Sequence, residues 1–108
     1  MQFTTTTKYF HVASNAVQSV FTTQGMFGGY YLDNTANAAT TYYQFFYKAS
    51  TAVSLGTTVA DFVIPVPAGL GANLPVAISC PALSFAVTTT YNGSTAPGSP
   101  IDCTFFIG

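Results

Sequence analysis

The residues able to do chemistry are few in this chain of 108 residues. It has one histidine, three aspartates, two lysines and two cysteines, with no arginine, glutamate or tryptophan. A Ser-His-Asp triad would need His11 as base, one aspartate to orient it, and one of eight serines as nucleophile. No serine has a nucleophile-elbow or other catalytic spacing. We therefore expect His11 to occupy a strand or arm, and the protein not to be an enzyme.

Asp33 lies in the oxygen-rich segment Leu32-Asp33-Asn34-Thr35, which could bind a weak Ca²⁺ ion. Calcium takes about six to eight oxygen ligands with several carboxylates, and this segment supplies one. An Asx-turn that closes the connection is the better interpretation. Cys80 and Cys103 could form a thiolate pair for a metal, but two ligands without histidine support make a poor site. The sequence therefore predicts no metal and no other cofactor.

Charged residues make up only 5% of the chain, against about 25% in typical globular proteins, and the net charge is −1. With two lysines there is no electrostatic footprint for nucleic acid. The longest apolar runs, near 62–67 and 81–87, are far shorter than the roughly 20 residues of a spanning helix, so no membrane partner is expected. Without an export signal, synthesis in a cytoplasm and two buried free thiols are expected rather than a disulfide.

The abundance of Thr, Val, Tyr and Phe, with few strong helix formers, favours strands. Short apolar or alternating runs separated by Gly, Pro, Asn and Ser predict an all-β fold with no substantial helix. We expect an antiparallel β-sandwich of jelly-roll type with about eight strands. The expected strands are 3–12, 16–22, 26–33, 41–48, 60–65, 74–79, 83–91 and 103–107, and the breaks are 34–39, 54–58, 67–73 and 92–100.

Aromatic side chains alternate along residues 42–48. One face carries Tyr43, Phe45 and Tyr47, which we expect to face the sandwich core. The other face carries Tyr42 and Phe46 together with Gln44 and Lys48. Partly exposed Tyr42 and Phe46 would suggest a subunit interface, whereas burial of both faces is about equally compatible with the sequence.

Three further segments predict particular local structures. The paired glycines Gly28 and Gly29 inside a strand predict a bulge or a close backbone approach. Pro65 and Pro67 each lack a backbone donor, so that segment should end a strand and run into a turn at Ala68-Gly69. Residues 1–15 are predicted to be an N-terminal strand or arm, paired either with a neighbouring subunit or within its own sheet, and residues 16–108 a single domain.

Five segments of residues 18–108 have an informative order and spacing, although each is weak alone. They are Gly25-Met26-Phe27-Gly28-Gly29-Tyr30-Tyr31-Leu32-Asp33-Asn34, Phe46-Tyr47-Lys48-Ala49-Ser50, Leu55-Gly56-Thr57, Pro67-Ala68-Gly69 and Leu83-Ser84-Phe85-Ala86-Val87-Thr88-Thr89. Read together, these segments resemble a family of small structural proteins from tailed-phage virions. The one departure is Cys80-Pro81-Ala82, where the family usually has Gly before the late strand.

The resemblance implies a capsid decoration, or cement, subunit on the virion surface that stabilises the head shell by bridging capsid subunits. Its expected partners are the major capsid protein or other virion proteins, and copies of itself, with a trimer favoured. The alternative is a carbohydrate- or receptor-binding head fibre or tail component, with Tyr91, Asn92 and Asp102 lining a sugar site. The expected interface residues are Phe3, Tyr9, Phe10, Tyr42, Phe46, Tyr91 and Asn92.

Overall fold

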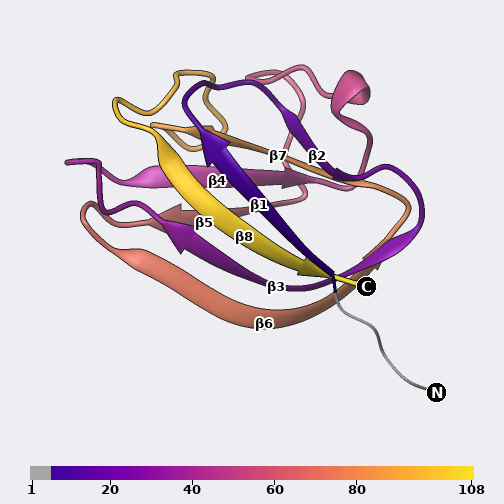
Figure 1. Cartoon of the computed structure of the whole chain (residues 1–108). Helices are drawn as coiled ribbons and strands as arrows, with labels where there is room; N and C mark the ends of the chain where they lie inside the picture. Colours follow the sequence, from indigo (N-terminus) through magenta and orange to yellow (C-terminus); the bar gives the residue numbers. More distant parts are fainter. Residues whose placement is uncertain (1–5) are drawn as a thin grey trace.

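Eight β-strands build the part of the chain that the computed structural model describes, residues 6–108 (Figure 1). The only other element there is a three-residue 3₁₀ turn, η1 (Ser50–Ala52). The prediction of an antiparallel all-β sandwich is confirmed. The strands are β1 (Thr6–Val12), β2 (Gln18–Phe21), β3 (Gly25–Asp33), β4 (Thr41–Phe46), β5 (Phe62–Val66), β6 (Gly71–Cys80), β7 (Leu83–Thr88) and β8 (Ile101–Ile107).

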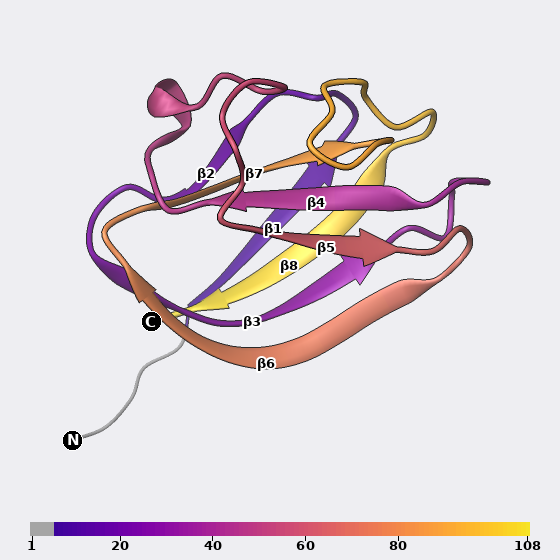
Figure 2. The same cartoon turned by 180° about the vertical axis from the view of Figure 1, so that it is seen from behind.

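The strands form two four-stranded sheets with the orders β1-β8-β3-β6 and β2-β7-β4-β5. Each of the first four strands pairs antiparallel with one of the last four: β1 with β8, β2 with β7, β3 with β6, and β4 with β5. The chain is thus one long antiparallel ribbon of strand pairs, folded so that alternate pairs lie in opposite sheets (Figure 2).

The core between the sheets is largely aromatic. The ring centroids of Phe45 and Phe62 lie 4.6 Å apart in a stacked arrangement, and those of Phe85 and Phe105 lie 4.9 Å apart edge to face. Such pairs stabilise a core beyond the burial of their area. Tyr43 and Phe45 are fully buried, as the alternation along β4 predicts, whereas Tyr47 is only partly buried at the rim of the core.

Two backbone irregularities match the sequence. The register of β3 against both neighbours shifts between Phe27 and Gly29, which confirms the bulge expected at the paired glycines. The amide of Leu70 donates to the carbonyl oxygen of Pro67, and Gly69 has a φ of +73°, which favours glycine. The break expected over residues 67–73 is too long, because β6 begins already at Gly71.

The outer face of the β2-β7-β4-β5 sheet is covered by the chain itself. All six residues of β7 are buried, including Ser84, whose hydroxyl donates to the carbonyl oxygen of Lys48 at 2.9 Å. Gln44 donates to the carbonyl oxygen of Gly93 at 3.1 Å. The two connections that provide these carbonyls, residues 47–61 and 89–100, arch over this sheet (Figure 2). Gln44 and Phe46 on the outer face of β4 are therefore buried, whereas Tyr42 on the same face is half-buried.

Candidate interaction surface

The expected interface residues do not gather on one surface. Phe3 lies outside the described residues. Tyr9 on β1 is 64% exposed, whereas Phe10 turns inward and packs on the core, with its ring centroid 5.0 Å from that of Phe85. Asn92 is exposed with a φ of +55°, so its position is a loop tip. β1 pairs with β8 along its whole length, so residues 6–12 are a strand of their own sandwich.

The prediction that Phe46 is an interface residue is wrong, because its side chain is fully buried. It lies on the outer face of β4, but the connections that cover that sheet remove it from solvent. Tyr42, on the same face, is half-buried and meets Tyr91 edge to face, with centroids 6.2 Å apart. Tyr91 itself is 64% exposed. Of these residues, Tyr91 offers the larger contact surface.

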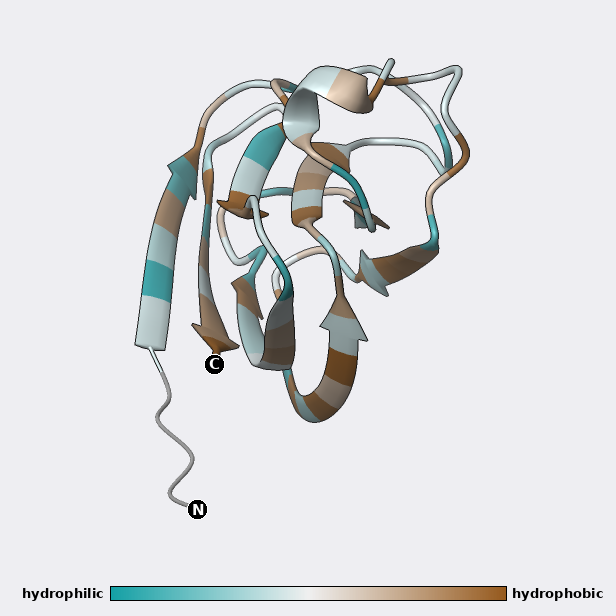
Figure 3. Ribbon diagram, turned by 90° about the vertical axis from the view of Figure 1, so that its right-hand side faces the viewer, coloured by the Kyte–Doolittle hydropathy of each residue, from teal (hydrophilic) through white to brown (hydrophobic). Residues whose placement is uncertain are grey.

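The other sheet has an outer face that none of the described segments covers. Strand alternation turns inward the buried residues of β8 and β3, such as Cys103 and Leu32, and turns their neighbours outward. Figure 3 shows this sheet edge-on, with β1 as its outermost strand. We call this surface the open face; it is formed by Tyr9, His11, Tyr31, Asp33, Asp102, Thr104 and Phe106.

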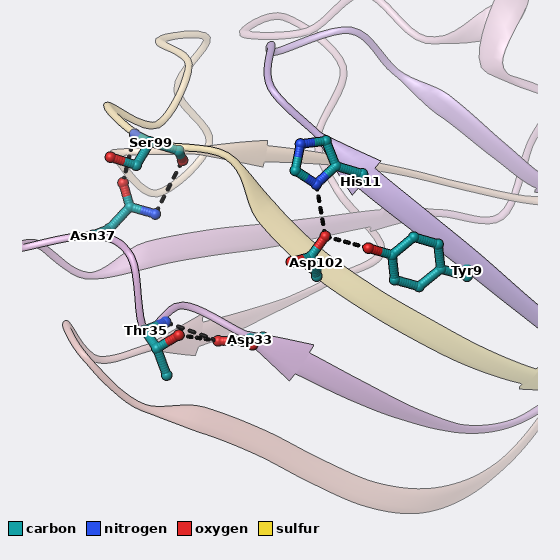
Figure 4. A network of polar contacts seen from close by, with 7 residues as sticks. All are labelled: Tyr9, His11, Asp33, Thr35, Asn37, Ser99 and Asp102. Carbon is teal, nitrogen blue, oxygen red and sulfur yellow. Dashed lines mark hydrogen bonds and ion pairs between the residues drawn. The ribbon is translucent and has the colours of Figure 1, made fainter.

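A hydrogen-bonded cluster joins β1 to β8 on the open face (Figure 4). The Tyr9 hydroxyl donates to Asp102 Oδ1 at 2.5 Å, and His11 Nδ1 lies 2.7 Å from the same oxygen. An aspartate thus orients His11, as a triad would require. Among the residues that the structure describes, however, the imidazole pairs with Asp102, and no serine joins the cluster. The cluster fastens an edge strand to its neighbour.

The hydrogen bonds of the cluster change the acidity of both partners. The hydroxyl of Tyr9, and then the imidazole of His11, stabilise the ionised carboxylate, so the pKa of Asp102 is lowered. The same contact with Asp102 raises the pKa of Tyr9, because ionised tyrosine would face a carboxylate. At neutral pH the cluster therefore holds a carboxylate and a neutral phenol.

Asp33 lies directly opposite Asp102 in the pairing of β3 with β8. Its carboxylate turns away toward Thr35 and accepts hydrogen bonds from the Thr35 amide at 2.9 Å and hydroxyl at 2.6 Å (Figure 4). This geometry confirms the predicted Asx-turn. Within residues 6–108, no group of three His, Cys, Asp or Glu side chains could hold a metal ion.

A shallow hollow of about 240 Å³ lies at the bulge of β3, between β6 and β8. Gly28 and Gly29 contribute no side chains there, and Leu74, Pro75 and Phe106 supply apolar walls. A Cβ at Gly29 would approach the Leu74 carbonyl oxygen at 3.2 Å, so glycine permits close packing of the strands. Tyr31, Phe106 and the hollow are surface features that sequence reasoning missed; the paired glycines were the only signal for them.

The sugar site expected from Tyr91, Asn92 and Asp102 is not assembled. Tyr91 packs on Tyr42, over the outer face of the β2-β7-β4-β5 sheet. Asp102 lies on the open face of the other sheet, across the core. These residues therefore belong to opposite sides of the sandwich.

Several hydrogen bonds hold the loop that carries Tyr91. Asn37 and Ser99 exchange two of them: Asn37 Nδ2 donates to the Ser99 carbonyl oxygen at 3.1 Å, and the Ser99 amide donates to Asn37 Oδ1 at 2.8 Å (Figure 4). The amide of Thr89 also donates to the carbonyl oxygen of Thr95. Both ends of the loop are therefore anchored.

No model of a known protein family matches this sequence, and no curated protein matches it. The resemblance to virion proteins therefore stays a prediction. Among the described residues, no helix is both long and apolar enough to cross a membrane.

Proposed function

We propose that this protein is a structural subunit of a tailed-phage virion, bound on the head as a decoration or cement protein. The observation that carries the proposal is the open face, an uncovered sheet surface with three exposed aromatic rings, on a chain with only five charged residues. Tyrosine and phenylalanine are enriched in protein interfaces. Burying such a surface requires little desolvation of ions, which is the costly part of covering a charged surface.

The charges on the open face are compatible with this role. Asp102 and Asp33 already accept hydrogen bonds from Tyr9 and Thr35 within the chain, so a partner would not leave them unsatisfied. The mechanism is passive: each copy bridges neighbouring shell subunits, and the contacts it adds must be lost before the shell opens. Many such contacts act together through avidity.

The strand pairing supports the jelly-roll type that the sequence predicts. In a jelly roll, eight strands form two sheets connected by two Greek keys. Pairing of β1 with β8, β2 with β7, β3 with β6 and β4 with β5 gives the rolled ribbon expected of that type. We infer a jelly roll, although fold alone does not assign function.

The test is to locate the protein on purified phage particles and then to prepare particles that lack this protein. We expect particles without it to release their genome at a lower temperature, and added protein to restore the original temperature. Tyr31→Ala should reduce occupancy on the particles, since Tyr31 is 46% exposed on the open face; Val59→Ala, at a 74% exposed site in a connection, is the matched control. Absence from particles, or unchanged stability without it, overturns the proposal.

A second candidate is a carbohydrate-binding head fibre or tail component. Tyr9 and Tyr31 lie on either side of Thr104 in one row across the sheet, so their Cα atoms are about 10 Å apart. Exposed aromatic rings beside hydroxyls can stack on sugars. Binding of host polysaccharide by the isolated protein, lost in Tyr31→Ala, would favour this candidate, whereas a glycan screen without binding would remove it.

A further inference from the structure

The four edge strands of the sandwich are unequally protected against pairing with another chain. An open edge presents unpaired backbone N–H and C=O groups, and proteins block such edges with proline, bulges, charges or short strands. β2 has four residues and a register shift between Ser19 and Phe21. β5 carries Pro65, and β6 carries Pro75 together with a register shift. Three of the four edges are therefore poor templates.

Of these protections, β1 has only a charge, Lys8. It pairs with β8 through seven consecutive residues without a register shift, and it contains no proline. Its residues are exposed from Thr6 to Tyr9, and the side chain of His11 is 59% exposed. Lys8 is its only fixed charge. Figure 3 shows β1 as the outermost strand of its sheet. Among the four edges that the structure describes, β1 is therefore the least protected against pairing with another chain.

We propose that β1 is the site at which two copies of this chain associate, through antiparallel pairing of β1 with β1 of the second copy. A heterologous contact would need a second usable edge, and the other three are blocked. An isologous contact needs only β1. The result is a continuous eight-stranded sheet that passes across the two-fold axis.

The register follows from the length and charge of the strand. With Tyr9 opposite Tyr9 of the second copy, all seven residues of β1 find a partner, because Tyr9 is the central residue of Thr6–Val12. Lys8 then lies opposite Phe10, so the two ammonium groups do not face each other. Centring the axis on Lys8 would place them directly opposite, which is unfavourable.

The pairing also extends the open face. The two Tyr9 residues flank the axis, and each stays attached to its own Asp102. The two open faces then form one surface with Tyr9 at its centre. Two paired strands bury less than a standard interface, so we expect association at micromolar concentrations, on the order of the weaker interfaces known. This inference concerns the isolated protein and does not depend on the virion proposal.

The first experiment is disulfide trapping in solution. Tyr9→Cys places two thiols opposite each other, and mild oxidation should yield a dimer of twice the 11.3 kDa chain. Thr7→Cys is the matched control, because Thr7 points to the same face but lies opposite His11 of the second copy, too far for a bond. The native thiols, Cys80 and Cys103, are buried and should not crosslink. Efficient trapping at Thr7 rather than Tyr9 overturns the register.

The second experiment measures affinity by sedimentation without any crosslink. Tyr9→Lys would place two ammonium groups on the axis, and the dissociation constant should rise at least about tenfold. Tyr31→Lys makes the same change on the open face two strands away and should leave dimerisation unchanged. A protein that stays monomeric at about millimolar concentration, that forms trimers, or whose dimer ignores Tyr9→Lys overturns the proposal.

Discussion

At the scale of single residues, the three aspartates accept hydrogen bonds from side chains and from the backbone of the same chain. Asp102 accepts hydrogen bonds from Tyr9 and His11, Asp33 accepts from Thr35, and Asp61 accepts from the Tyr47 amide at 2.6 Å. Each aspartate thus has at least one hydrogen-bond partner within the chain.

The Asp102 cluster predicts a small pH dependence of stability. Because the folded state lowers the pKa of Asp102, its contribution is present above the ordinary value of 3.8 and is lost as pH falls through the folded pKa. Asp102→Asn should therefore lower the melting temperature slightly at neutral pH. The difference from the native protein should shrink below about pH 4.

Thermal unfolding of both proteins across this pH range checks the prediction. Since Asp102 is 44% exposed, added salt should also reduce the difference in melting temperature between the two proteins at neutral pH. A difference in melting temperature that stays constant down to about pH 2 would mean that ionisation of the Asp102 carboxylate does not contribute to stability.

At the scale of elements, two long connections between strands cover one face of a sheet. Residues 47–61 and 89–100 cover the outer face of the β2-β7-β4-β5 sheet and bury Gln44, Ser84 and Phe46. Gln44 Nε2 donates to Thr88 Oγ1 at 2.7 Å and to the Gly93 carbonyl oxygen at 3.1 Å. One sheet is thereby covered on both faces, whereas the described residues leave the outer face of the other sheet exposed.

Phe46→Ala tests this coverage. The ring is fully buried, so its loss should lower the free energy of unfolding by about 3–5 kcal/mol, measured by urea titration of the isolated protein. Tyr91→Ala is the control: at 64% exposure it should lower that free energy by less than about 1 kcal/mol. Equal small effects of both changes would instead indicate that Phe46 is accessible in solution.

At the scale of the whole molecule, the sandwich encloses two free thiols. Cys80 and Cys103 are 3% and 1% exposed, and burial raises the pKa of Cys103 to about 12. The expectation of two buried free thiols is confirmed. Thiolate is the reactive form of cysteine. Burial keeps reagents away from both sulfur atoms, and the raised pKa values keep both thiols protonated.

A thiol reagent should therefore report unfolding of the whole sandwich. We expect almost no labelling of the native protein at neutral pH and two thiols per chain in denaturant, read by absorbance. Rapid labelling of one thiol in the native state would show that a strand opens locally. The Tyr9→Cys variant provides the positive control, since its new thiol is exposed.

Sequence alone determined the eight strands and several local details. Alternation and breaker residues marked each strand, the paired glycines marked the bulge, and Asp33 marked the Asx-turn, because these are local steric and hydrogen-bonding properties. Strand ends were less certain: β6 starts at Gly71, since pairing with β3 extends it. The expectation of a reducing compartment, from the lack of an export signal, likewise indicated buried free thiols.

Only the tertiary structure decided which faces are covered. The alternation along β4 separates two sides but cannot say that distant connections would cover one of them, so Phe46 was misassigned to an exposed face. His11 and Asp102 are 91 residues apart, and Tyr9 is 93 from Asp102; pairing of β1 with β8 brings them together. Exposure and clustering depend on contacts between segments remote in the chain, which local patterns do not encode.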